Sequence, residues 1–97
     1  MSTLHIVSKS PFRTDALQRC LALAGAGDSI ILIEDGVLAV NQTALTNAIA
    51  SLNIRCFALS DDLAARSLGT DGTAVSATDM AGFVQLVCEH RNSLTHA

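Results

Sequence analysis

Ser29-Ile30-Ile31-Leu32-Ile33 is the most informative segment of this 97-residue sequence. Its four consecutive apolar residues do not alternate with polar ones, as they would in a strand with one face in water. A continuous apolar run of this length is typical of a strand that helices cover on both faces. The run stops at Glu34-Asp35-Gly36, where acidic residues and glycine favour a turn. The sequence therefore predicts a buried strand inside a parallel sheet.

Alternating strand and helix patterns surround this segment. Further strands are predicted at residues 4–7, 54–59 and 74–76, and helices at residues 14–24, 43–53, 62–68 and from 78 onward. Strands that alternate with helices imply crossover connections and helices on both faces of one sheet. We therefore predict a three-layer α/β fold that spans residues 1–97 as a single domain. Its mostly parallel four-stranded sheet has the order 2-1-3-4, and the polar tail from about residue 92 is expected to fray.

Composition excludes several classes of function. With 49% hydrophobic and 15% charged residues, the chain is apolar for its size, so part of its surface is expected to contact another subunit. Six Lys and Arg residues, a net charge of −3 and no Tyr or Trp argue against direct nucleic-acid binding, which needs clustered cations or stacking platforms. No leader and no membrane span are evident, and a soluble, cytoplasmic protein is expected.

Two familiar site motifs are missing where the fold would need them. Residues 8–12, Ser-Lys-Ser-Pro-Phe, follow the first strand at the position of a dinucleotide-binding glycine motif or of the acidic cluster of a receiver domain. Gly-Ala-Gly at residues 25–27 precedes a strand instead of opening a helix. The acidic residues that could collect a metal are interpreted as helix caps and turn residues: Asp35, Asp61, Asp62 and Asp79. No cofactor and no metal site are predicted.

Histidine and cysteine residues supply the remaining reactive groups. His5 lies within the first strand and is expected to be a hydrogen-bonded core or interface residue, whereas His90 and His96 are expected to face solvent. Cys56 and Cys88 are interpreted as small buried apolar residues. Cys20 stays open between core packing and reactivity, because nearby Arg13 and Arg19 could favour a thiolate but the middle of a helix does not.

Several short motifs follow one another along nearly the whole chain. They are Thr3-Leu4-His5 with Ser10-Pro11-Phe12, then Glu34-Asp35-Gly36-Val37, then the run from Phe57 to Arg66, then Asp79 with Phe83-Val84, and finally His90. Their order and spacing resemble the TusB/DsrH family, although no single motif is a catalytic signature. The resemblance implies a DsrEFH-like fold.

The resemblance also implies a role in sulfur relay. Members of this family join two related small α/β subunits, of the TusC/DsrF and TusD/DsrE types, in a heterohexamer. Such complexes carry sulfur as a cysteine persulfide, chiefly on the D/E subunit, and pass it to an acceptor protein of the TusE/DsrC type. Tus complexes support 2-thiouridine formation at the tRNA wobble position, which is the expected function here, and Dsr complexes support intracellular sulfur oxidation.

Cys20 is the candidate catalytic residue that the resemblance provides, because DsrH-like members tend to have a cysteine in the first helix. It would act as an auxiliary persulfide carrier, with the main catalytic cysteine on a partner subunit. The alternative from a different class of function is a purely structural scaffold subunit without chemistry of its own. The sequence leaves the two roles open.

Overall fold

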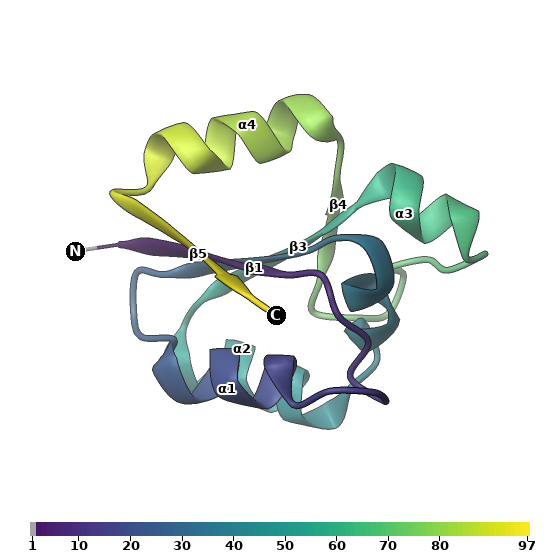
Figure 1. Cartoon of the computed structure of the whole chain (residues 1–97), viewed down its shortest axis with the longest axis horizontal. Coiled ribbons are helices and arrows are strands. Elements are labelled where there is room, and N and C mark those ends of the chain that lie inside the picture. The colour runs from purple at the N-terminus through teal and green to yellow at the C-terminus, as the bar shows by residue number, and fades with distance from the viewer. Residues whose placement is uncertain (1) are drawn as a thin grey trace.

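The computed structural model describes residues 2–97 as a five-stranded parallel sheet in the order β4-β3-β2-β1-β5 (Figure 1). In chain order the elements are β1 (Thr3–Val7), α1 (Ala16–Leu23), β2 (Ser29–Leu32), the 3-10 helix η1 (Glu34–Ala39), α2 (Thr43–Leu52), β3 (Arg55–Leu59), α3 (Ser60–Ala65), β4 (Ser76–Thr78), α4 (Met80–Glu89) and β5 (Asn92–His96). All four strand pairs are parallel. Within residues 2–97, no helix combines the length and the apolar character needed to span a bilayer.

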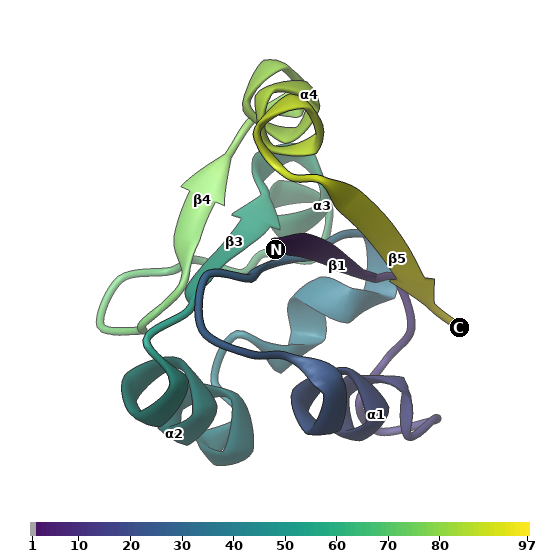
Figure 2. The ribbon, with the colours of Figure 1, turned by 90° about the vertical axis from the view of Figure 1, so that its left-hand side faces the viewer.

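Helices cover the two faces of the sheet unequally. Helices α1 and α2 lie on one face, and α4 lies alone on the other (Figures 1 and 2). From β1 to β4 the chain adds each new strand on the same side, and α4 then carries it back across the sheet to β5 at the opposite edge. The short α3 contacts β3 and η1 instead of covering the sheet. Strands β1, β2 and β3 therefore lie inside the sheet, and β4 and β5 form its edges.

Strand β2 is buried at all four of its positions. Because successive side chains of a strand point to opposite faces, Ile30 and Leu32 join the large core cluster under α1 and α2, whereas Ile31 joins a smaller cluster with Leu4 and Leu86. The continuous apolar run is thus explained by cover on both sides. The predicted class, an α/β fold with a parallel sheet between layers of helices, is confirmed.

The predicted strand number and order, four strands as 2-1-3-4, are wrong. Residues 92–96 form a fifth strand that pairs with β1 from Thr3 opposite Asn92 to Val7 opposite His96. Strand β5 occupies the side of β1 that the prediction assigned to the third strand, so β3 pairs with β2 instead. The tail was expected to fray because it is polar, but four of its five residues are exposed and an edge strand tolerates polar side chains.

The acidic residues divide into one cap and several other roles. The side chain of Asp79 accepts a hydrogen bond from the Gly82 amide at 2.8 Å and caps α4, as predicted. The predicted capping of α3 by Asp61 and Asp62 is wrong, because Leu59 holds the cap position and that end has no side-chain cap. Asp62 instead accepts a hydrogen bond from the Glu34 amide at 2.7 Å, which links α3 to the start of η1.

Arg66 completes the connection between α3 and η1. Its guanidinium donates to Asp35 Oδ1 from Nε at 3.1 Å and from Nη2 at 2.8 Å, and its Nη1 donates to the Asp62 carbonyl oxygen at 3.1 Å. Asp35 is therefore a partner of an arginine across two elements, not only a turn residue. A carboxylate held by two guanidinium nitrogens is a well-oriented pair, so the loop after β2 is fixed to α3.

Replacing Asp79 with Ala should destabilise the protein by about 0.5–2 kcal/mol, because the Gly82 amide loses its acceptor at the start of α4. Asp61 provides the matched control, since it is exposed and does not cap α3. The free energy of unfolding from urea titrations measures both effects. Equal losses in Asp79→Ala and Asp61→Ala would contradict the assignment of the cap.

Gly36 is the position where the loop after β2 touches the end of β1. A Cβ atom there would clash with the carbonyl oxygen of Val7, which is backbone and cannot swing aside. We expect Gly36→Ala to cost about 1–3 kcal/mol, as for other overpacked sites. Gly69→Ala is the control, because a Cβ at Gly69 meets no atom within 4 Å. Urea unfolding should separate the two variants, and comparable stability of both would exclude the close approach.

Candidate functional site: a buried cluster of cysteine and histidine

Three residues from three elements form a buried cluster around Cys20. Helix α1 directs Cys20 toward the sheet, β1 supplies His5 and β5 supplies His96. The sulfur of Cys20 and one ring nitrogen of each histidine all lie within 4.8 Å of one another, and all three residues are buried. The cluster exists only because β5 pairs with β1, so its third member, His96, depends on the fifth strand.

A chain of hydrogen bonds orients the two histidines. His5 Nε2 lies 2.9 Å from Asp28 Oδ2, and His5 Nδ1 lies 2.9 Å from His96 Nε2. Asp28 also accepts hydrogen bonds from the amides of Thr3 at 2.9 Å and Gly25 at 3.0 Å. Since an ionised carboxylate only accepts, the network assigns the proton of His5 to Nε2, and His5 Nδ1 then accepts from His96 when both rings are neutral.

The protonation of this network follows from its surroundings. Burial alone would raise the pKa of Asp28, but the hydrogen bonds from His5, Gly25 and Thr3 outweigh it and hold the pKa below its ordinary value. The pKa of His96 is lowered, first by burial and then by the neighbouring His5 and Arg19. Asp28 is therefore an anion and His96 a neutral ring near pH 7.

Cys20 is fully buried, and its thiol is not activated. Burial, and secondarily the charge of Asp28, raises its pKa to about 12. The expected help from Arg19 is absent, because Arg19 pairs with Asp15 one turn earlier in the exposed part of the helix and bonds the Ala97 carbonyl oxygen. A nucleophilic cysteine must be a thiolate. In this conformation the geometry gives Cys20 the character of a core residue.

The other sequence-based assignments have mixed outcomes. His5 is a hydrogen-bonded core histidine and Cys56 is buried, as predicted, with a pKa raised to about 12 chiefly by burial. The prediction that His90 and His96 face solvent is wrong, since both are buried. His90 reaches inward from the end of α4, with Nδ1 2.7 Å from the Leu86 carbonyl oxygen and Nε2 3.0 Å from the Ser29 hydroxyl.

Cys88 is exposed, so its prediction as a buried residue is also wrong. Helix α4 covers only a small core cluster and presents most of its circumference to solvent. Of its ten residues, Leu86 alone is buried. An apolar stripe on this helix therefore did not imply burial.

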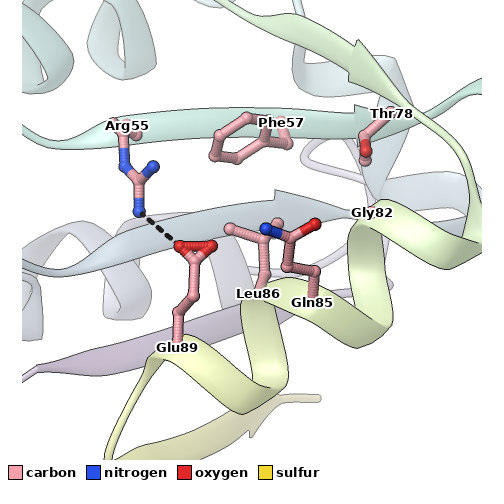
Figure 3. A pocket seen from close by; sticks show the side chains of 7 residues that line it. All are labelled: Arg55, Phe57, Thr78, Gly82, Gln85, Leu86 and Glu89. Atoms are coloured by element: carbon pink, nitrogen blue, oxygen red, sulfur yellow. Dashed lines mark ion pairs between the residues drawn. The ribbon is translucent and has the colours of Figure 1, made fainter.

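A pocket opens on the other face of the sheet, between β3 and α4 (Figure 3). Its lining consists of Arg55, Phe57, Thr78, Gly82, Gln85, Leu86 and Glu89. The guanidinium of Arg55 lies 5.7 Å from the centroid of the Phe57 ring and 4.0 Å from a carboxylate oxygen of Glu89. None of the seven is a cysteine or histidine, so the pocket has no group suited to carry sulfur.

Comparison with known proteins identifies the class and then the family. A parallel sheet with helices on both faces (Figure 2) defines the class, a small α/β protein. The family model described as DsrH like protein matches residues 9–93. The chain belongs to the DsrH family, and the family resemblance inferred from the sequence motifs is confirmed.

Relatives and solved structures agree with this assignment. Protein TusB of Enterobacter sp. is 33% identical over 94 residues, covering 95% of this chain and 98% of its own, and Protein TusB of Erwinia tasmaniensis is 39% identical over 88 residues, covering 86% and 88%. The crystal structure of the ychN protein from E. coli has a TM-score of 0.81 at 17% identity, covering 98% of this chain and 99% of its own. The solution structure of protein Tm0979 from Thermotoga maritima gives 0.67 at 22%, covering 90% and 92%. The two structures share the fold.

Thiol reactivity should follow burial. In the folded, metal-free chain we expect iodoacetamide to modify Cys88 first, while Cys20 and Cys56 react only after unfolding, because the latter two thiols are buried and protonated. Mass spectrometry of tryptic peptides over time measures the order, and the urea-unfolded chain serves as the control in which all three react. Modification of Cys20 as fast as Cys88 in the folded chain would contradict the closed cluster.

Proposed function

We propose that this chain is a subunit of a heteromeric sulfur-relay complex that supports 2-thiouridine formation at the tRNA wobble position. Membership of the DsrH family carries the proposal, together with similarity to TusB proteins along nearly the whole length of both chains. The partners would be two related small subunits, of the TusC/DsrF and TusD/DsrE types, in a heterohexamer. An acceptor of the TusE/DsrC type would receive the sulfur, in the cytoplasm.

A role inside a complex accords with the surface of the chain. Several large apolar side chains are exposed: Phe12, Leu23, Met80, Val84, Val87 and Leu94. Exposed apolar groups of this size are common where one protein meets another. An obligate contact would bury on the order of 2,000 Å² or more.

The geometry favours a structural part in the relay over a catalytic one. Sulfur transfer to a cysteine requires an accessible thiolate, whereas Cys20 is buried and its pKa is about 12. The persulfide would then form on a partner, and this chain would support the partner's site. A DsrH-like role in sulfur oxidation, with Cys20 as an auxiliary carrier, is the second candidate, because the buried thiol lies beside two histidines that could act as bases if β5 moved.

The experiment reconstitutes the chain with its proposed partner subunits and supplies a persulfide donor. We expect mass spectrometry to find the added sulfur atom on a cysteine of a partner and not on the Cys20 peptide. Cys20→Ala should leave transfer to the acceptor within about twofold of the original, since a small apolar residue fills most of the site. Cys88→Ala is the matched control for a thiol outside the cluster.

Two results would change the assignment. Added sulfur on Cys20, lost together with transfer in Cys20→Ala, would make this residue a carrier. A chain that stays monomeric with the partner subunits present, and whose deletion leaves 2-thiouridine in cellular tRNA unchanged, would contradict the relay role itself. Quantifying that nucleoside separates the tRNA route from sulfur oxidation.

A further inference from the structure

We propose that His5, Cys20 and His96 form a binding site for a zinc-type divalent ion. The site would use His5 Nδ1, His96 Nε2 and Cys20 Sγ as ligands. It is independent of the sulfur-relay role, because it rests only on where the fold places these three side chains. A metal there would join α1, β1 and β5.

The donor set fits this class of ion. Two imidazole nitrogens and one thiolate are ligands that Zn²⁺ prefers, whereas Mg²⁺ and Ca²⁺ prefer oxygen. The three donor atoms converge within 4.8 Å, from three different elements. Three protein ligands leave one position of a tetrahedral ion for water or another small ligand.

Asp28 supplies the support that a metal-bound histidine usually has. Metal-binding histidines commonly donate their second ring N–H to a carboxylate, which fixes the tautomer and the orientation of the ring. His5 Nε2 faces Asp28 Oδ2 at 2.9 Å, so the lone pair of His5 lies on Nδ1, which faces His96 Nε2 at 2.9 Å. Asp28 is itself held by the amides of Thr3 and Gly25. The arrangement places a carboxylate, a histidine ring and the proposed ligand atom His5 Nδ1 in series.

Metal binding requires the two facing rings to separate and reorient, and it requires the Cys20 sulfur to come closer than the 4.8 Å within which the three donor atoms now lie. The two facing nitrogens are 2.9 Å apart, and the ring centroids are 5.2 Å apart with planes inclined by 25°. Tetrahedral Zn²⁺, with Zn–N bonds of about 2.0–2.1 Å, would place them roughly 3.3 Å apart. His96 lies at the end of β5, an edge strand that has a neighbour on one side only, so its displacement by this amount disturbs one strand pair.

The protons balance as follows. Cys20 loses its thiol proton to solvent when sulfur binds the ion. His96 stays neutral, but its proton moves from Nε2 to Nδ1 through solvent, so that Nε2 can donate its lone pair. His5 keeps its proton on Nε2 toward Asp28. Binding therefore releases one proton per ion, and no oxidation or reduction takes place.

Cobalt provides the test, because Co²⁺ takes zinc sites and reports thiolate ligation by a charge-transfer absorption. Titration of the purified, metal-free full chain with Co²⁺ should saturate at one equivalent with that band, and Zn²⁺ should then displace Co²⁺. Cys20→Ser should abolish the band, and His96→Gln should weaken binding at least tenfold. Asp28→Asn keeps all three ligands and should weaken binding about 10–100-fold. Circular dichroism verifies that each variant is folded.

Cys88→Ser is the matched control, since it removes an exposed thiol outside the cluster and should leave the titration unchanged. One-to-one binding with thiolate character, lost in Cys20→Ser and kept in Cys88→Ser, supports the site. The proposed site would be overturned if the folded wild-type chain showed no saturable Co²⁺ binding. It would also be overturned if the charge-transfer band were lost in Cys88→Ser and kept in Cys20→Ser. Retention of full affinity in both His96→Gln and Asp28→Asn would also overturn it.

Discussion

The pairing of β1 with β5 is the interaction on which the chemistry of this molecule depends. It pairs the edge of β1 that faces away from β2 and brings His96 into contact with His5. Cys20 is fully buried beside this pair of strands. A hydrogen bond between two imidazole rings is strengthened where both rings are shielded from water and correctly oriented. Asp28 provides the orientation, and α1 and the sheet provide the shielding. The cluster is consequently a property of the assembled sheet.

The parts of the fold that apolar patterns determine could be predicted from the sequence. Local sequence patterns predict the buried strand β2, the helices α1 and α2, and the helix cap at Asp79. The tertiary structure agrees with each of these predictions. The fifth strand did not follow, because an edge strand is held by backbone hydrogen bonds and can have polar side chains throughout. The predicted strand order was wrong for the same reason. No local sequence pattern indicates that β5 occupies the side of β1 that β3 was expected to take.

The candidate site was half accessible to sequence reasoning. Cys20 could be singled out, and His5 could be placed in a buried strand. Asp28 precedes β2 by one residue, so the parallel pairing of β1 and β2 could have suggested that it lies beside the start of β1. His96 could not be found without β5. The possibility of a thiolate at Cys20 depended on Arg13 and Arg19 along the chain, but the side chain of Arg19 points to Asp15 instead.

Because the chain is synthesised from the N-terminus, the edge strand β5 is made last. The His5–His96 bond spans 91 positions of the chain, so β1 must wait for β5 long after β2 and β3 have been made. A nascent sheet of four strands would leave one side of β1 unpaired and the thiol of Cys20 without its cover of β5. Before β5 docks, small reagents and neighbouring chains can therefore reach the sulfur of Cys20. Pairing of β5 with β1 ends this exposure.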